Sequence, residues 1–197
     1  MAWMGWNRES KLPTVEQLEG EMDRVQYQKS YKKALRGTIY ALIIVAGVSM
    51  LIATLLISVL RIYGDNMNPT INSGEMVVAY KTSHCRKGDV AAFYYNNKIL
   101  VRRVIALPGE TVEINEEGTV YVNGNPLSEP YLEGTSLGQC DIRMPYEVPG
   151  DQIFVLGDNR QEAADSRMVA VGCVPQEQML GKVVLRVWPM EQFGFVK

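Results

Sequence analysis

The hydrophobic and polar positions of the chain form three successive patterns. Residues 1–36 are mostly polar with an apolar stripe, residues 38–60 carry no charge, and the remainder has short apolar runs separated by turn residues. A spacing of three and four residues predicts a helix, whereas short β-branched or aromatic runs between turns predict strands. The pattern therefore predicts a helical beginning followed by an all-β domain.

The first pattern predicts a helix that begins near Thr14. Gln17 follows Thr14 at capping-box spacing and Pro13 precedes it. Acidic residues come early and basic residues late, which suits the helix dipole. This helix would lie on the inner membrane face or against a partner helix, or would be a simple cytosolic lead-in. The apolar stripe consists of Val15, Leu18, Met22 and Val25.

The uncharged segment 38–60 predicts a transmembrane helix. Its 23 residues would extend roughly 34 Å as a helix, against a bilayer core of about 30 Å. The run is longer than the apolar region of a secretory signal peptide and begins well inside the chain. We therefore expect an uncleaved signal-anchor that crosses the membrane once.

Basic residues flank this segment unequally. Four lie within the ten positions before it, at Lys29, Lys32, Lys33 and Arg36, whereas Arg61 alone lies close behind it. The positive-inside rule then places residues 1–37 in the cytoplasm and residues 61–197 outside the plasma membrane.

The segment after Arg61 predicts an all-β, barrel-like exterior domain. Asn96-Asn97, Gly118 and Asn123-Gly124-Asn125 are turn signals between apolar runs. The predicted strands are residues 75–80, 90–95, 99–106, 111–114, 119–122, 152–156 and 182–187.

Composition excludes several classes of function. With 20 basic and 22 acidic residues the net charge is -2, so no basic surface is expected for nucleic acid. The one histidine, His84, excludes a multi-histidine metal site and is interpreted as a solvated loop residue. No metal or cofactor is predicted.

The three cysteines, Cys85, Cys140 and Cys173, have neither metal-site spacing nor the density of a disulfide framework. One bridge at most is possible. Cys140 with Cys173 is the hypothesis for it, because both are expected outside the membrane.

Four motifs carry a resemblance to a known family. They are Gly-Asp-Asn-Met-Asn-Pro-Thr-Ile at 64–71, Arg-Lys-Gly-Asp at 86–89, Arg-Arg-Val-Ile-Ala-Leu-Pro-Gly-Glu at 102–110, and Gly-Asp-Asn-Arg at 157–160 with Asp-Ser-Arg at 165–167. Their order and separation resemble those of the type I signal peptidases. The resemblance implies a membrane-anchored β domain of the signal peptidase type, in a family that removes signal peptides from exported proteins.

In that family a serine attacks the peptide bond and a neutral lysine removes its proton. The resemblance places Asn66 at the serine position, Arg102 at the lysine position, and Ala163 where a serine orients the lysine. A carboxamide has no usable nucleophilic atom, and a guanidinium stays protonated. We therefore expect a non-catalytic homologue; Ala163 favours drift over deliberate replacement of the pair.

The remaining motif residues are expected to support the site and hold the domain together, since charge-assisted arginine pairs brace a scaffold whether or not it cleaves. A buried Arg102 should itself be paired, with the Asn66 carboxamide oxygen or a carboxylate among Asp65, Asp158 and Asp165. The supporting residues are Gly64, Met67, Pro69, Arg103, Asp158, Arg160, Asp165 and Arg167.

Two functions stay open. The chain is either a binding module for signal peptides or other extended segments of exported proteins at the membrane, or an active signal peptidase with an unrecognised nucleophile. Ser73, Ser83 and Ser166 are the available hydroxyls for the second function. A cleavage assay with a preprotein separates the two, and the sequence identifies neither the client nor the oligomeric state.

Overall fold

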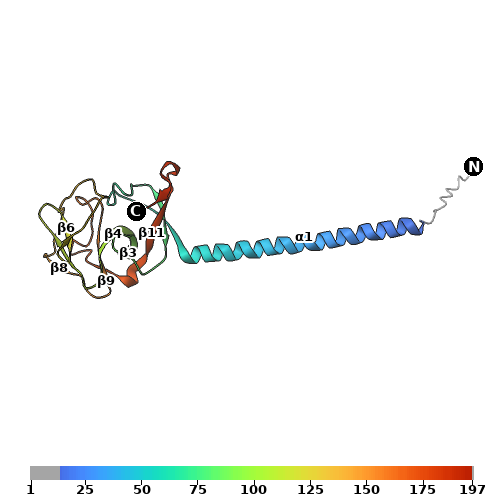
Figure 1. Ribbon diagram of the computed structural model, residues 1–197, viewed down its shortest axis with the longest axis horizontal. Coiled ribbons are helices and arrows are strands. Elements are labelled where there is room, and N and C mark those ends of the chain that lie inside the picture. Colours follow the sequence, from blue (N-terminus) through green and yellow to red (C-terminus); the bar gives the residue numbers. More distant parts are fainter. Residues whose placement is uncertain (1–13, 197) are drawn as a thin grey trace, which may run out of the picture. The chain divides into compact units, whose positions relative to one another are not determined.

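The computed structural model describes residues 14–196, in which one long helix precedes two β-sheets (Figure 1). Helix α1, Val15–Leu56, begins as predicted. The main-chain N–H of Thr14 donates a hydrogen bond to Oε1 of Gln17 at 3.2 Å, which is the reciprocal bond of a capping box. Pro13 lies outside the described residues.

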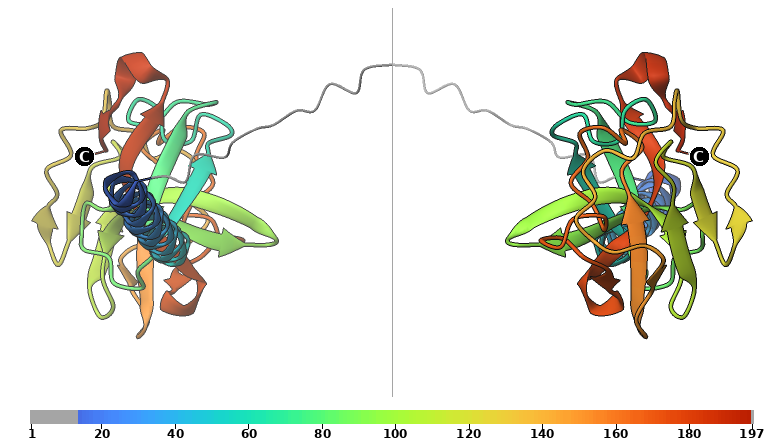
Figure 2. Two further views of the ribbon diagram at one scale, coloured as in Figure 1. Left: turned by 90° about the vertical axis from the view of Figure 1, so that its right-hand side faces the viewer. Right: turned by 90° about the vertical axis from the view of Figure 1, so that its left-hand side faces the viewer.

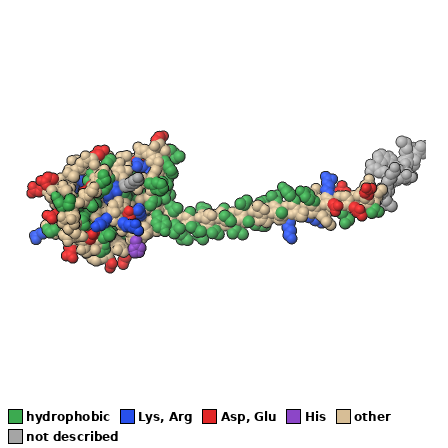
Figure 3. Space-filling view, viewed as in Figure 1, with side chains coloured by type: hydrophobic (Ala, Val, Ile, Leu, Met, Phe, Trp, Pro, Cys, Tyr) green, Lys and Arg blue, Asp and Glu red, His purple; other side chains and the backbone are tan. Residues whose placement is uncertain are grey.

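The apolar part of α1 has the exposure expected of a helix that faces lipid. None of its residues is buried, and hydrophobic side chains cover the part of the helix that follows the charged N-terminal turns (Figure 3). The helix ends at Leu56, four residues before the end of the predicted span 38–60. Residues 57–60 instead belong to strand β1, which pairs with β2 at the edge of the larger sheet. The shorter helical span of roughly 28 Å is still close to the thickness of a bilayer core.

The larger sheet has eight strands in the order β1-β2-β11-β3-β4-β9-β10, with β12 beside β11 (Figure 2). Its path has two ends, β1 and β10, and its strand pairs are antiparallel, so the predicted barrel-like domain contains an open antiparallel sheet and not a closed barrel. The strands are β1 (Ile57–Arg61), β2 (Met76–Tyr80), β3 (Val90–Tyr95), β4 (Lys98–Ala106), β9 (Gln152–Leu156), β10 (Val174–Pro175), β11 (Met179–Trp188) and β12 (Gly194–Phe195).

The smaller sheet has four strands in the order β7-β6-β5-β8. All seven predicted strands are confirmed across the two sheets. The unpredicted strands are β1, which continues the apolar run, and four strands of two residues, which are too short for a periodic signal. The strands are β5 (Thr111–Ile114), β6 (Val120–Val122), β7 (Asn125–Pro126) and β8 (Tyr146–Glu147), and two 3₁₀ turns are η1 (Gln176–Gln178) and η2 (Met190–Gln192).

Two predicted hairpin turns are confirmed by their backbone angles. Asn96 and Asn97 have φ of 43° and 63°, and Asn123 and Gly124 have φ of 53° and 77°. Two consecutive residues with positive φ make the tight turn whose twist matches antiparallel strands. The first of these turns sets the register of β3 against β4, and β4 carries part of the site.

The cysteines are free thiols, so the proposed bridge between Cys140 and Cys173 is absent from the structure. Cys140 Sγ donates to the carbonyl of Ile142 at 3.8 Å, whereas Cys173 packs against the apolar cluster under the smaller sheet. Burial raises the pKa of the Cys173 thiol to about 11. The two side chains therefore have separate local partners.

Candidate functional site

The segment 64–71 is held in a fixed turn at one edge of the larger sheet. Gly64 has φ of +78°, which favours glycine. Met67 and Ile71 are 1% and 0% exposed and belong to the core beneath β1 and β2. Because these two side chains point into the core, the intervening and adjoining polar residues, including the half-buried Asn66, lie toward the surface.

Gly157 brings three predicted site positions together. A Cβ atom at this glycine would lie 2.2 Å from Cβ of Ala163, 2.6 Å from the main-chain oxygen of Asn66 and 3.6 Å from Cδ of Arg102. The next turn adds a hydrogen bond, from N–H of Asn159 to the oxygen of Asn66 at 3.1 Å. The close approach requires glycine, and it places Asn66, Arg102 and Ala163 around one point.

A network of buried ion pairs surrounds this point. Arg103 binds Asp158 through Nε and Nη2 at 2.9 and 2.6 Å, and Thr70 donates a hydrogen bond to the same carboxylate. Arg167 binds Asp165 through Nε and Nη2 at 2.8 and 2.7 Å. Both pairs have the two-point geometry that fixes position as well as charge. They tie β4, the 64–71 turn and the 157–167 loop together.

Arg160 completes the network with a partner that sequence reasoning missed. Its Nη1 and Nη2 donate to the carboxylate of Glu129 at 3.2 and 2.5 Å. The neighbouring Tyr131 lays its ring 3.8 Å from the guanidinium carbon of Arg103 and donates to Glu129 at 2.7 Å. Burial and Glu129 raise the pKa of Tyr131. Glu129 is 31 residues from Arg160, in a loop without periodicity, so no local pattern marks it.

Arg102 differs from these arginines. It is 3% exposed, and its Nε and Nη1 donate to the main-chain oxygens of Ala164 and Val101 at 2.8 and 2.6 Å. The predicted pairing with Asn66 or a carboxylate is wrong for the described residues. Asp158 and Asp165 are already occupied by Arg103 and Arg167.

Burial of the Arg102 charge is correspondingly unfavourable. Burial lowers the pKa of the guanidinium to about 10, an effect that Asp165 partly opposes and Arg167 reinforces. This pKa is still well above neutral, so Arg102 remains a cation and cannot serve as a base at pH 7.

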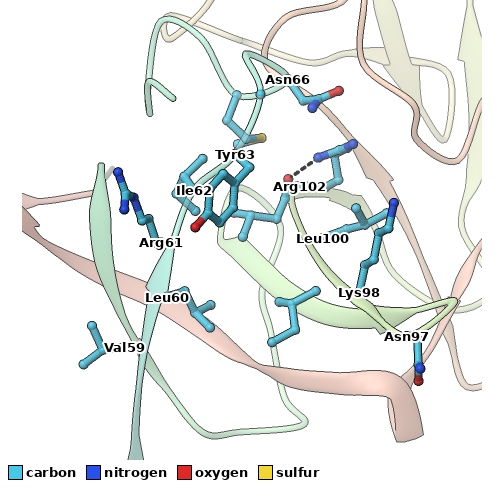
Figure 4. Close-up of a pocket in the computed structure, with 14 residues that line it drawn as sticks. Val59, Leu60, Arg61, Ile62, Tyr63, Asn66, Asn97, Lys98, Leu100 and Arg102 are labelled. Carbon is cyan, nitrogen blue, oxygen red and sulfur yellow. Dashed lines mark hydrogen bonds between the residues drawn. The ribbon is translucent and has the colours of Figure 1, made fainter. Parts of the chain in front are cut away.

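A groove of about 600 Å³ opens beside these residues (Figure 4). One wall is residues 59–64 with residues 66 and 67, and the other is residues 97–102. Asn66 and Arg102 lie at one end of the groove, and Asn97 lies at the other.

Both walls include strand edges without a partner in the described residues. β1 pairs only with β2. The first half of β4 pairs only with β3, because β9 joins β4 from Arg103 onward.

Comparison with known proteins identifies the architecture around the groove. Residues 35–188 match the family described as signal peptidase, peptidase S26. The chain belongs to this family. It is 33% identical to signal peptidase IB of Staphylococcus aureus strain MRSA252, covering 83% of this chain and 95% of that protein. It is 34% identical to signal peptidase I of Leptolyngbya laminosa, covering 66% of this chain and 68% of that protein.

A protein of solved structure has a similar sequence identity to this chain. The crystal structure of a signal peptidase I from Enterococcus faecalis V583 is 34% identical and covers 50% of this chain and 96% of that chain, with a TM-score of 0.44. Membership of the signal peptidase family, together with the single apolar N-terminal helix, makes the chain a single-pass membrane protein.

The lining of the groove is poor in side chains that could act as a nucleophile or a base. Among the described residues that line it there is no serine, threonine, cysteine or histidine. Tyr63 supplies a hydroxyl, but it makes no hydrogen bond to Lys98 or Arg102 that could activate it.

The other candidate hydroxyls lie away from the groove. Oγ of Ser73 accepts a hydrogen bond from N–H of Gly64 at 3.1 Å, and Oγ of the buried Ser166 accepts one from N–H of Val155 at 3.0 Å. Ser83 and His84 lie in the loop before Asp89, where N–H of His84 donates to Thr82. The groove therefore brings together Asn66 and Arg102 but none of the alternative nucleophiles.

Proposed function

We propose that this member of the signal peptidase family binds signal peptides or other extended segments of exported proteins without cleaving them. One observation carries the proposal: a groove between two free strand edges ends on Asn66 and Arg102. The resemblance to active relatives places these residues where a nucleophile and a base would be.

The two strand edges support the binding half of the proposal. Residues 98–102 of β4 and the outer edge of β1 offer main-chain N–H and C=O groups toward the groove. An extended peptide can add to such edges as another strand, with affinity from main-chain hydrogen bonds and selectivity from alternate side chains. Five residues of strand extend roughly 16 Å, so the groove suits a short extended segment.

The side chains at the Asn66 and Arg102 end of the groove support the non-catalytic half. Asn66 offers a carboxamide, and the buried cation Arg102 has no proton-accepting form at neutral pH. Ala163, 5% exposed beside Gly157, has no hydroxyl to orient a base. The ion pairs around this end depend on Arg103, Arg160 and Arg167 and not on the reacting groups, so the scaffold can persist without the chemistry.

The groove belongs outside the plasma membrane in this proposal. Residues 1–37 would be cytoplasmic, the apolar segment 38–60, helical to Leu56, would cross the membrane, and residues 61–197 would form the exterior domain. The support is the excess of basic residues before the apolar segment. Protease added to intact spheroplasts should degrade the exterior domain, and protection of that domain would reverse the orientation.

Site-specific photocrosslinking tests the binding function. A photoreactive amino acid at Ile99, in the groove, should crosslink to the signal-peptide region of an uncut preprotein added to the full-length chain in detergent. The same group at Glu116, exposed in the turn between β5 and β6, is the matched control and should not. Equal crosslinking from both positions, or none from Ile99, would contradict binding in the groove.

A further inference from the structure

The end of the groove at Asn66 and Arg102 holds a buried cation without a carboxylate bound to it. Of the four arginines that are buried in residues 14–196, three have an acidic partner: Arg103 with Asp158 at 2.6 Å, Arg160 with Glu129 at 2.5 Å and Arg167 with Asp165 at 2.7 Å. Arg102 donates hydrogen bonds only to the neutral carbonyl oxygens of Val101 and Ala164, and Asp165, which acts on its charge without contacting it in an ion pair, is bound by Arg167. Burying an ion without an opposite charge is costly.

Two polar groups at this end have unused hydrogen-bonding capacity. Within the described part of the chain, Nη2 of Arg102 and the side-chain amide of Asn66 make no hydrogen bond, although Nε and Nη1 of Arg102 do. Among the described residues, Nε of Arg186 is the one fully buried side-chain nitrogen or oxygen without a hydrogen-bond partner. Because Nη2 of Arg102 and the Asn66 amide also lack partners, neither of them is fully buried. Both residues line the groove (Figure 4). The end of the groove thus presents a cation and an amide to whatever lies in it.

We propose that the groove binds peptides by a free C-terminal carboxylate, held at one end by Arg102 and Asn66. The inference rests on the proposed function, because the remainder of the peptide uses the strand edges of β1 and β4. A carboxylate supplies the negative charge that Arg102 lacks and accepts hydrogen bonds from both side chains. An internal peptide segment presents only a neutral carbonyl there and brings no negative charge to the cation.

This ligand chemistry gives the chain a place in a reaction sequence. A new C-terminal carboxylate arises when an endopeptidase hydrolyses a peptide bond, with one water consumed and one carboxylate and one amine formed. The chain would then act after cleavage, on the released N-terminal segment.

Binding measurements on the full-length chain in detergent test the inference. The probe is a fluorescent peptide of about six alanine and valine residues, long enough to span the strand edges, made with a free carboxylate, with a terminal amide, and with further residues beyond the same sequence. A hydrogen-bonded charge at the peptide terminus predicts that the free acid binds at least about tenfold more tightly than the other two forms.

Variants of the chain test whether Arg102 causes the preference for the free acid. Arg102→Met should bring the free acid and the amide to within about twofold of each other, and Arg102→Lys should keep a preference for the acid. Arg143→Gln, which removes an exposed cation that does not line the groove, is the matched control and should keep the wild-type preference. The wild-type comparison of acid with amide stands by itself if circular dichroism shows that Arg102→Met does not fold.

The outcomes separate this inference from the proposed function. Equal binding of all three peptides would overturn the carboxylate site and leave a groove that binds extended segments. Binding of none of them would count against the groove function and the carboxylate site together. If the preference for the acid were lost in Arg143→Gln and kept in Arg102→Met, the carboxylate would bind elsewhere, and the assignment to Arg102 would be overturned.

Discussion

Two adjoining regions of the β domain treat buried arginine in different ways. In the bracing network each of Arg103, Arg160 and Arg167 meets a carboxylate. At the end of the groove Arg102, which is buried to the same extent, meets two main-chain carbonyls and no acid. The network satisfies its charges within the protein, whereas the Arg102 cation has no carboxylate among its hydrogen-bond partners and is the group that we propose for a ligand.

The difference shows that the ion pairs of the scaffold do not use the side chains of Asn66 and Arg102. The network depends on Asp158, Asp165 and Glu129, and none of them contacts the Asn66 carboxamide. If Asn66 and Arg102 stand in place of a nucleophile and a base, as we propose, that replacement leaves the pairs that shape the site intact. Substitutions at the groove end should then change catalysis, whereas substitutions in the bracing network should change stability.

The largest expected effect is a gain of cleavage at the groove end. Asn66→Ser with Arg102→Lys should process a preprotein, with Ala163→Ser as an added support, whereas each single change supplies a nucleophile without a base or a base without a nucleophile. Loss of either member of such a pair costs on the order of a million-fold. The double variant should exceed both singles by several orders of magnitude in a gel-based processing assay. Comparable processing by either single variant would show that the two positions do not act as a pair.

The next effect concerns the bracing network. Asp165→Asn leaves the buried Arg167 without its carboxylate and should lower the free energy of unfolding by about 3–5 kcal/mol. Lys182→Met is the control, because the pair of Lys182 with Asp89 is partly exposed and should contribute less than about 1 kcal/mol. Denaturant unfolding in detergent, followed by tryptophan fluorescence, measures both. Similar losses in the two variants would contradict the structural role given to the network.

Gly157 links the two regions and should tolerate no side chain. Gly157→Ala places a methyl group 2.2 Å from Cβ of Ala163 and 2.6 Å from the oxygen of Asn66, so we expect a loss of about 1–3 kcal/mol from overpacking. Gly150→Ala is the control, since a methyl group there meets no atom within 4 Å. Equal unfolding midpoints for both variants would mean that the close approach at Gly157 is not a constraint.

The smallest effect on stability is expected for Arg102. Arg102→Met removes a charge that burial disfavours, at the cost of two hydrogen bonds to carbonyls, so the free energy of unfolding without peptide should stay within about 1 kcal/mol of wild type or rise. The direction agrees with the lowered pKa of Arg102, because a cation with a depressed pKa is less favourable in the folded than in the unfolded chain. A loss as large as that of Asp165→Asn would erase the distinction between the regions.

Much of the fold was accessible from the sequence because its signals are local. Short β-branched and aromatic runs between turn residues predicted seven of the strands, and the paired asparagines predicted the turn that sets the register of β3 against β4. The end of α1 was not accessible in this way. Residues 57–60 are as apolar as the helix before them, and only pairing with β2, a distant contact, makes them a strand.

The site was predictable in part for the same reason. The motif resemblance indicated Asn66, Arg102 and Ala163, and the structure brings all three to Gly157. The partners of the arginines were not predictable, because they depend on distances across the fold. Glu129 binds Arg160, and Asp158 and Asp165 already bind Arg103 and Arg167, so none of these three carboxylates forms an ion pair with Arg102.

The most direct test of the central claim is a cleavage time course. The full-length chain in detergent would be mixed in molar excess with a preprotein and sampled over hours by gel electrophoresis and mass spectrometry, beside an active signal peptidase as a positive control. The account predicts intact preprotein throughout in the presence of this chain. A mature product cut at one bond behind the signal peptide would show that the groove has a working nucleophile and would contradict the claim.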